Sequence, residues 1–291
     1  MQNLEDWYSS GERINVVSAQ KEGTEGFNIF CKVEGKGPWL TFLHGFPTCS
    51  WDWAKLVPEL KNQQKLLLFD FLGFGDSDKP ARHKYSIFEQ ADITEVLWQH
   101  FNVDETTLIA HDYGDTVALE LLSRQEDGQL STKISRVVML NGGIYVDYQR
   151  PLLIQRLLCK PILGFLISQV LTQSTFKKRF ASIFSKSNPI LDSELEQYWQ
   201  VVSLGGGVKI THRIIRYLSE RRKYKTRWEN SLENSKTSIR FIWGLEDPVS
   251  GRSISEQIKR RLPGAELMEI EGVGHYPQLE VPDVVREAIN E

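Results

Sequence analysis

One turn in the sequence constrains the fold more than any other feature. Ala110 and Gly114 stand two residues before and two residues after Asp112, between a short strand-like run and a helix-like run. Small residues at these two places are what a sharp strand-to-helix elbow requires, because larger side chains would clash with neighbouring elements. Such an elbow pushes its central side chain out at the carboxyl end of a parallel sheet. Asp112 is therefore predicted to face a site at that edge, with a helix N-terminus beneath it.

The rest of the chain supplies the strands and helices that this elbow needs. Short apolar runs typical of buried strands alternate with helix-like segments, which favours a parallel sheet covered on both faces. We therefore expect an α/β fold, the α/β-hydrolase fold, with a mostly parallel eight-stranded sheet and helices on both sides. The expected strands are 13–17, 28–33, 39–43, 65–69, 107–110, 136–140, 238–243 and 266–270, and the expected helices include 87–101, 116–124, 252–261 and 280–290.

The strand pattern is interrupted from about residue 144 to residue 229, where only helix-like segments occur. This predicts a core made of 1–143 and 230–291 and an inserted helical cap over 144–229. The cap segment holds 15 basic and 6 acidic residues, although the whole chain has a net charge of −3. A solvated helix face is the favoured interpretation of this excess, and contact with an anionic lipid surface or an acidic substrate is the weaker one. Much of the excess comes from Arg216, Arg221, Arg222, Lys223, Lys225 and Arg227.

The longest apolar stretch of the chain, 151–171, lies inside this cap. Charged and amide side chains and a central Pro161 argue against a spanning helix. Two short buried or half-buried helices are favoured over a membrane-facing surface. The apolar side chains of this region are expected to line or cover an apolar pocket, and they are Leu152, Leu153, Leu157, Leu158, Ile162, Leu163, Phe165 and Leu166.

An aspartate at the elbow changes the reaction relative to an esterase, which carries a serine there. A carboxylate that attacks an sp3 carbon leaves an ester on the enzyme, which water can hydrolyse, whereas a serine would leave an ether. No GxSxG pattern occurs in the chain, so no serine competes for this role. Asp112 therefore points to carbon–halogen bonds or epoxides as the reacting groups, rather than to carboxylic esters.

Two later residues complete a catalytic set in the order that this fold uses. Asp247 follows the strand-like run 238–243, and His275 lies in a glycine-rich loop after 266–270. We expect His275 to act as the general base for water and Asp247 to orient it. The oxyanion of the second step is expected to accept hydrogen bonds from the backbone N–H groups of Phe46 and Tyr113.

Composition limits cofactors and partners. Three widely spaced cysteines form no CxxC pair, and His44, His83, His100, His111 and His212 show no metal-ligand spacing, so we expect neither a metal nor another cofactor. The small net charge gives no indication of nucleic acid binding. The cysteine usage and an N-terminus without the pattern of a signal peptide lead us to expect a cytoplasmic location. A monomer and a homodimer both stay open.

Five motifs resemble the epoxide hydrolase and haloalkane dehalogenase branch of the α/β-hydrolases. They are HGFP (44–47), DFLGFGDSDKP (70–80), HDYG (111–114), WGLEDP (243–248) and GHYPQLE (274–280). Within that branch the chain looks most like the mesoderm-specific transcript protein group, on the run YSIFEQADITEVL (85–97) together with HDYGDTVALELL (111–122). The likeness spans most of the core and is patchier in the cap.

The resemblance implies two ways to handle the leaving group. Haloalkane dehalogenases hold the halide with a tryptophan after the nucleophile and usually an asparagine or a second tryptophan, but Tyr113 and Phe46 occupy these places. Trp51, Trp53 or a donor from the cap are the open alternatives for this role. Epoxide hydrolases protonate the opening ring with two cap tyrosines. Tyr217 matches the second of these, and the first is open among Tyr145, Tyr148 and Tyr198.

These features favour an epoxide hydrolase-like enzyme that acts on a small or lipid-like apolar epoxide without a cofactor. The first alternative is dehalogenation of an alkyl halide or halo-acid by the same ester mechanism. A cofactor-free oxygenase of the luciferase kind and a binding protein without catalysis are further alternatives. The complete set of Asp112, Asp247 and His275 argues against the last of them, because a binding protein has no need of all three.

Overall fold

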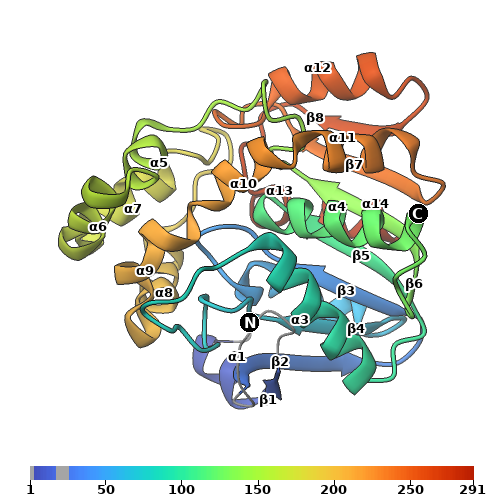
Figure 1. Cartoon of the computed structure of the whole chain (residues 1–291). Coiled ribbons are helices and arrows are strands. Elements are labelled where there is room, and N and C mark those ends of the chain that lie inside the picture. Colours follow the sequence, from blue (N-terminus) through green and yellow to red (C-terminus); the bar gives the residue numbers. More distant parts are fainter. Residues whose placement is uncertain (1–2, 18–25) are drawn as a thin grey trace.

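A computed structural model describes residues 3–17 and 26–291 of the chain. Its centre is one eight-stranded sheet with the strand order β1-β2-β4-β3-β5-β6-β7-β8 (Figure 1). The strands are β1 (Glu12–Val16), β2 (Phe27–Gly35), β3 (Trp39–Leu43), β4 (Lys65–Phe69), β5 (Glu105–His111), β6 (Lys133–Leu140), β7 (Ser238–Gly244) and β8 (Glu266–Ile270).

The sheet is mostly parallel, as the alternation of strands and helices predicts. Pairing is antiparallel where β2 meets β1 and β4, and parallel from β4 through β3, β5, β6 and β7 to β8. The expected fold class is therefore confirmed. The carboxyl ends of the parallel strands lie at one edge of the sheet, which is where ligands bind in open α/β sheets.

Helices cover both faces, because successive residues of each buried strand point to opposite sides. In β5, Leu108 and Ala110 belong to one core cluster and Ile109 to the other. The first cluster contains side chains of α3 (Ile87–His100), α4 (Tyr113–Glu126) and α12 (Arg252–Arg261). The second contains side chains of α1 (Leu4–Ser9), η1 (Ser50–Trp53), α2 (Val57–Leu60), α13 (Pro277–Glu280) and α14 (Pro282–Asn290).

The helices between β6 and β7 form what we call the helical insertion. They are α5 (Leu153–Leu158), α6 (Pro161–Val170), α7 (Gln173–Ala181), α8 (Asp192–Ser203), η2 (Leu204–Gly206), α9 (Gly207–Ile214), α10 (Tyr217–Lys223) and α11 (Lys225–Asn234). In Figure 1, α5, α6 and α7 project from the body of the molecule, whereas α11 lies beside the core. Residue 229 falls within α11, and the division into core and cap domains at 144 and 229 stays a prediction.

Two element boundaries differ from the sequence expectation. The helix expected over 280–290 begins instead with Pro282, at the first helical position, and a separate short helix, α13, precedes it. Proline is favoured at a helix start because its missing N–H would have no partner there. The helix expected from residue 116 begins at Tyr113, directly after the elbow residue. Among the described residues, no helix has both the length and the apolar character that crossing a bilayer requires.

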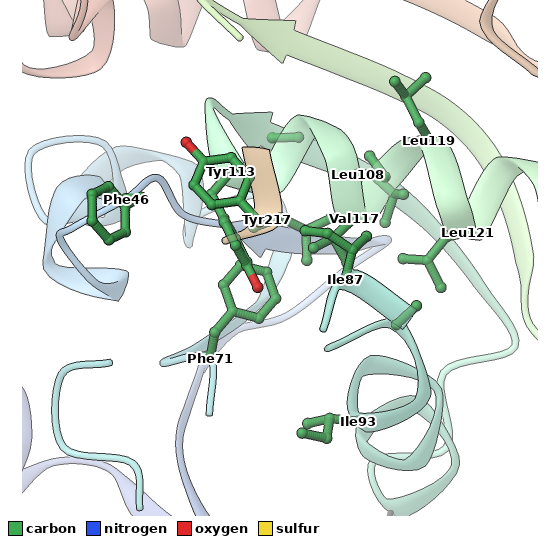
Figure 2. Close-up of a cluster of buried hydrophobic side chains, with 14 of the residues drawn as sticks. Phe46, Phe71, Ile87, Ile93, Leu108, Tyr113, Val117, Leu119, Leu121 and Tyr217 are labelled. Atoms are coloured by element: carbon green, nitrogen blue, oxygen red, sulfur yellow. The ribbon is translucent and has the colours of Figure 1, made fainter. Parts of the chain in front are cut away.

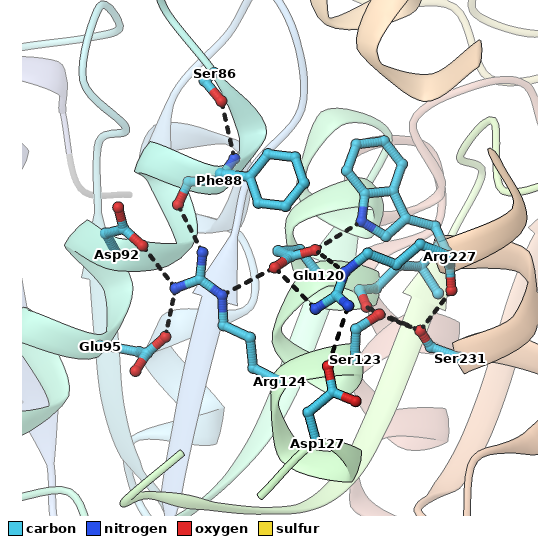
Figure 3. A network of polar contacts seen from close by, with 12 residues as sticks. Ser86, Phe88, Asp92, Glu95, Glu120, Ser123, Arg124, Asp127, Arg227 and Ser231 are labelled. Carbon is cyan, nitrogen blue, oxygen red and sulfur yellow. Dashed lines mark hydrogen bonds and ion pairs between the residues drawn. The ribbon is translucent and has the colours of Figure 1, made fainter. Parts of the chain in front are cut away.

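A network of charged side chains fastens α11 to the core (Figure 3). The buried Glu120 of α4 accepts hydrogen bonds from Arg124 of the same helix at 2.9 Å and from Arg227 of α11 at 2.9 Å. The indole N–H of Trp228 donates to the same carboxylate at 2.9 Å. Because one buried carboxylate joins two helices, the end of the insertion is held in a defined position on the core. The sequence suggested that Arg227 belongs to a solvated face, but its hydrogen bond to Glu120 joins it to the core.

Candidate active site

The elbow holds Asp112 in a strained backbone conformation at the end of β5. Its φ is 48° and its ψ is −98°, which non-glycine residues rarely adopt and which is typical of functional sites. A Cβ atom on Gly114 would lie 2.1 Å from the carbonyl oxygen of Leu43 in β3, so a glycine is required there. The close approach of α4 to β3 therefore explains the small residue that the sequence carries two places after Asp112.

The loop after β3 contacts the carboxylate of Asp112. The backbone N–H of Phe46 donates to Oδ2 of Asp112 at 3.1 Å. A Cβ atom on Gly45 would lie 2.6 Å from Nδ1 of His111, which is why this loop can approach so closely only with a glycine. Tyr113 is the first residue of α4. Among the described hydrogen bonds, none joins the Tyr113 N–H to the Asp112 carboxylate, so the structure brings one of the two expected oxyanion donors into contact.

Asp247 and His275 form a buried pair at the same edge of the sheet. Nδ1 of His275 lies 2.7 Å from Oδ2 of Asp247. Burial alone would lower the pKa of His275, but the charge and hydrogen bond of Asp247, with the Asp112 charge, raise it to about 8. Burial would raise the pKa of Asp247, yet the His275 charge and hydrogen bonds lower it below its ordinary value. The pair is therefore poised to carry a proton on His275.

Two residues that the sequence interpretation misses hold Asp247 in place. Nδ2 of Asn141 donates to its Oδ2 at 3.0 Å, and Oγ of Ser250 donates to the same atom at 2.6 Å. Asn141 follows β6 with a positive φ of 36° and also binds both backbone groups of Gly244. The signal available in the sequence is a polar residue at the carboxyl end of a buried strand, beside the strand that carries Asp247. The run 141–143 predicts only the end of a strand when it is considered alone.

His111 supports the loop that carries His275. Its Nε2 lies 2.8 Å from the backbone carbonyl oxygen of His275, and the two rings are 5.0 Å apart. Burial, and then the charge of His275, lower the pKa of His111 well below its ordinary value. A neutral His111 that donates from Nε2 to the carbonyl is consistent with this environment. It belongs to the surroundings of the site, although the sequence shows no partner arrangement for it.

Tyr217 lies over the elbow among aromatic rings. Figure 2 shows Tyr217, Tyr113, Phe46 and Phe71 together at one end of the core cluster. The Tyr217 ring is 4.8 Å from that of Tyr113 and 5.9 Å from that of Phe46. Its hydroxyl is buried and has no hydrogen-bond partner among the described residues. Burial, and then the nearby charge of Asp112, raise its pKa above the ordinary value.

Arg221 is the largest departure from the sequence expectation. The sequence groups it with a solvated basic face, but only 1% of it is exposed, because α10 turns its guanidinium toward the elbow. Nη2 donates to the backbone carbonyl of Asp112 at 2.6 Å and lies 3.7 Å from its Oδ1. Nε donates to Thr116 at 2.5 Å, and Nη1 donates to Gln149 at 3.3 Å. The guanidinium also lies 4.7 Å from the ring centre of Tyr217, so it joins the insertion to both elbow and tyrosine.

The other candidates for leaving-group contacts lie elsewhere. Tyr145 and Tyr148 pack against Arg261 and Arg260 of α12, and Tyr198 packs against Phe180 of α7. None of these three tyrosines has a contact with Asp112 among the described interactions. The two indoles also have other neighbours, since Trp51 packs against Trp7 and Trp53 against Phe42. No described residue cluster of three or more histidines, cysteines or carboxylates is arranged to hold a metal ion.

An apolar cavity leads from this site into the insertion. It has a volume of about 110 Å³, and its lining includes His275 and Phe46 at the core. On the insertion side it is lined by Ile154 and Leu158 of α5 and by Phe176 of α7. Leu152 and Leu158 thus line the pocket, as expected for the apolar residues of this region. The expectation is wrong for the residues that are absent from the lining and exposed, which are Leu153, Ile162, Leu163, Phe165 and Leu166. The half-buried Leu157 is also absent from the lining.

Comparison with known proteins identifies relatives along most of the chain. A family model described as alpha/beta hydrolase fold matches residues 38–282. The putative hydrolase LipZ of Mycobacterium tuberculosis is 35% identical over 254 residues, which cover 87% of this chain and 88% of LipZ. The mesoderm-specific transcript homolog protein of Bos taurus is 35% identical over 295 residues, with 96% of this chain and 84% of that protein covered. The resemblance inferred from the motifs is therefore confirmed.

Solved structures share the fold at lower identity. A mutant of the haloalkane dehalogenase DatA from Agrobacterium tumefaciens aligns with a TM-score of 0.77 at 19% identity, covering 97% of this chain and 96% of that chain. The epoxide hydrolase CorEH aligns with a TM-score of 0.71 at 19% identity, covering 96% and 97%. At this identity the likeness shows the fold alone, so the choice between the two chemistries depends on the site.

Proposed function

Since the chain belongs to the α/β-hydrolase fold family, we propose that this hydrolase opens an apolar epoxide to a diol through a covalent ester on Asp112. One observation carries the proposal. The residue at the elbow is a carboxylate, held by the Phe46 N–H and near enough to His275 for its charge to raise the pKa of that residue. A carboxylate nucleophile gives an ester that activated water can hydrolyse, which fits both the elbow residue and the base beside it.

In the first step, a carboxylate oxygen of Asp112 attacks one ring carbon and the carbon–oxygen bond of the epoxide breaks. Because Oδ2 accepts the Phe46 N–H, Oδ1 is the oxygen that we assign as the nucleophile. The ring oxygen becomes an alkoxide and takes the phenol proton of Tyr217. The unpartnered hydroxyl of Tyr217 supports this role, because no competing acceptor among the described residues holds its proton.

In the second step, His275 removes a proton from water, and the hydroxide attacks the ester carbonyl carbon of Asp112. The carbonyl oxygen becomes an oxyanion that the Phe46 N–H stabilises, with the Tyr113 N–H as the second expected donor. Collapse breaks the bond to the substrate and releases the diol, whose second hydroxyl takes its proton from the new carboxyl group. The proton on His275 then returns to the Tyr217 phenolate, so that the cycle closes.

Arg221 acts in this scheme as a positioning residue. Its donors hold the backbone carbonyl of Asp112 and the Thr116 hydroxyl, so they orient the elbow rather than the substrate. Its charge beside the Tyr217 ring also favours the phenolate that forms in the first step. The electrostatic effect is large because the guanidinium is buried and water does not screen it.

The neighbours of the nucleophile favour an epoxide over a halide. A leaving halide needs N–H donors directed at it, and the residues in those places are a phenylalanine and a tyrosine, without an indole N–H. A leaving alkoxide needs one proton, and Tyr217 has one beside the elbow. Dehalogenation therefore stays the second candidate, with nothing in the site that favours it over the first.

A paired substrate assay tests this choice. The wild-type protein is incubated with a terminal alkyl epoxide and with the alkyl bromide of the same chain length, and diol and alcohol are measured by gas chromatography. We expect diol formation, and we expect Tyr217→Phe to lower it about 100-fold because the alkoxide loses its acid. Turnover of the bromide alone would contradict the proposal.

The matched control is Tyr113→Phe. Tyr113 lies 4.8 Å from Tyr217 and is equally buried, but its hydroxyl has no part in the scheme. Its loss is expected to change diol formation less than about threefold, an effect typical of a non-reacting contact. Equal losses in the two variants would mean that packing, rather than proton donation, explains the effect of Tyr217→Phe.

A further inference from the structure

The helix α6 reverses the arrangement of an ordinary surface helix, in which apolar side chains face the protein and polar side chains face solvent. Its buried residues are Gly164, which faces α5, and Ser168, which faces α9. A Cβ atom on Gly164 would lie 2.0 Å from the carbonyl oxygen of Leu158, and Ser168 bonds to His212 of α9 at 2.9 Å. The small and polar side chains thus face the protein, where apolar side chains would be expected.

The opposite face of α6 exposes large apolar side chains. Ile162 is 79% exposed, Leu166 is 55% exposed and Val170 is 73% exposed. Residues four apart lie on one face of a helix, so these three form a stripe, and the half-exposed Phe165 lies beside it. Leu153 of α5 adds a further side chain that is 71% exposed. We call Leu153, Ile162, Phe165, Leu166 and Val170 the apolar patch. Contiguous exposed apolar side chains of this kind mark an interaction surface.

The charge around the apolar patch has one sign. Between residues 150 and 191 the sequence contains seven basic residues and no acidic residue. Lys177 forms an ion pair with Glu196 of α8. The other six, which are Arg150, Arg156, Lys160, Lys178, Arg179 and Lys186, form no ion pair with any described residue. A partner that fits this surface must therefore offer both apolar and negatively charged groups.

The cavity of the site borders the same region. Ile154 of α5 lines the cavity, while the preceding residue, Leu153, belongs to the apolar patch. Arg179 of α7 also lines the cavity and is exposed, so the basic segment borders the cavity. In Figure 1, α5, α6 and α7 form the part of the molecule that projects farthest from the sheet. A flat partner can therefore reach this surface without meeting the core.

We propose that the apolar patch and the basic residues around it dock on an anionic lipid surface. Amphipathic helices that lie in a membrane interface place apolar side chains among the acyl chains and basic side chains near anionic headgroups. The basic stems reach past the apolar residues to the headgroups. A lipid surface supplies both groups at once over a wide area, unlike an acidic peptide. If the proposed function holds, an apolar substrate dissolved in the bilayer passes from this surface into the cavity.

Vesicle sedimentation tests the proposal without any turnover, so that its failure is distinct from a failure of the proposed function. The full chain is centrifuged with phosphatidylcholine vesicles and with vesicles that contain about 30% phosphatidylserine, a strongly anionic surface. We expect binding to the anionic vesicles and at least tenfold weaker binding to the neutral ones. Ile162→Gln/Leu166→Gln should lower binding to the anionic vesicles about tenfold or more, because two large apolar side chains no longer leave water.

Matched variants distinguish binding through this surface from nonspecific binding to vesicles. Val17→Gln/Val284→Gln removes two exposed apolar side chains of the core and should leave binding unchanged. Lys160→Glu/Lys178→Glu should abolish the preference for anionic vesicles, and Lys36→Glu/Lys84→Glu, with two exposed core lysines, should preserve it. Circular dichroism checks that each variant is folded.

Two results would overturn the proposal. The first is wild-type protein that stays in the supernatant with both kinds of vesicle. The second is a stable dimer in light scattering that Ile162→Gln/Leu166→Gln converts to monomers, since a second copy would then cover the apolar patch.

Discussion

The helical insertion uses its positive charge in two opposite ways. At α10 and α11, Arg221 and Arg227 turn inward and bind the elbow and a buried carboxylate of the core. At α5 to α7, basic residues such as Lys160 and Lys178 are exposed beside large apolar side chains. The same residue types therefore hold the site together at one end of the insertion and leave an unpaired surface at the other. A charge excess in the sequence thus does not by itself indicate a solvated face.

We assign the inner end of the cavity, at His275 and Phe46, to the chemical steps. We assign the outer end, at the apolar patch and the basic residues around it, to the delivery of substrate. Changes near Asp112 and His275 should thus alter kcat, while changes on α6 should alter binding to lipid and leave the chemistry intact. The following variants test this separation, beginning with the largest effect.

The substitution His275→Gln should have the largest effect on turnover. Attack by Asp112 needs no base, but hydrolysis of the ester does, so turnover should fall about 1000-fold while the ester accumulates. Intact-mass spectrometry after mixing with epoxide should show the protein plus one substrate. An unmodified protein with wild-type diol production would mean that His275 is not the base.

The substitution Arg221→Met should have the next largest effect on turnover. Loss of the guanidinium removes the hydrogen bond to the backbone carbonyl of Asp112 and the cation that lies 3.7 Å from its Oδ1. We therefore expect kcat to fall about 100-fold with little change in KM. Breaking a buried ion pair should also lower the free energy of unfolding by about 3 kcal/mol. Chemical denaturation and steady-state kinetics measure the two effects.

Two control variants test whether the effect of Arg221→Met is specific to the Arg221 guanidinium. Arg222→Met removes the neighbouring exposed cation of α10 and should leave both quantities unchanged. Arg221→Lys should restore part of kcat, because a cation returns but the planar donor set does not. A loss of stability in Arg221→Met without any loss of kcat would show that Arg221 serves only the fold.

The pH dependence should follow His275, whose pKa is raised to about 8 by Asp247. The base must be neutral to activate water, so ester hydrolysis should rise about tenfold per pH unit at low pH and level off above a midpoint below 8, because the ester no longer carries the Asp112 charge that helps to raise the pKa of His275. Stability should change in the other direction. A raised pKa in the folded state contributes about 2 kcal/mol below the ordinary pKa near 6.5, and this is lost as the pH rises through 8. Single-turnover kinetics and denaturation at several pH values check both slopes, and Asp247→Asn should move the kinetic midpoint down.

The smallest effect on kcat is expected from changes in the apolar patch, at the outer end of the cavity. Ile162→Gln/Leu166→Gln should change kcat for a short, water-soluble epoxide by less than about twofold, the range of ordinary surface substitutions. The same variant should lose activity on a long-chain epoxide presented in anionic vesicles. Equal losses with the soluble and the vesicle-borne substrate would contradict the division of the cavity into two ends.

The fold and the spacing of the candidate site could be predicted because both depend on local patterns. Ala110, Asp112 and Gly114 predict an elbow from their sizes, and the strand-like runs on either side follow from periodicity. Arg221 could not be predicted as a neighbour of Asp112, because the contact depends on how α10 packs against the elbow, which no local pattern determines. Asn141 stands at a predictable strand end, but its hydrogen bonds to Asp247 and Gly244 depend on the order of the strands in the sheet, which local patterns do not give. The exposure of α6 depends on which helices cover it, and an apolar sequence alone does not determine that.

Isotope labelling of Asp112 tests the central claim most directly. The wild-type protein is allowed repeated turnovers of an epoxide in H₂¹⁸O, and the peptide that contains Asp112 is then mapped by mass spectrometry. We predict that ¹⁸O enters the Asp112 carboxylate, because water attacks the ester carbonyl rather than the substrate carbon. An Asp112 peptide that stays unlabelled after many turnovers, with ¹⁸O found only in the diol, would contradict it.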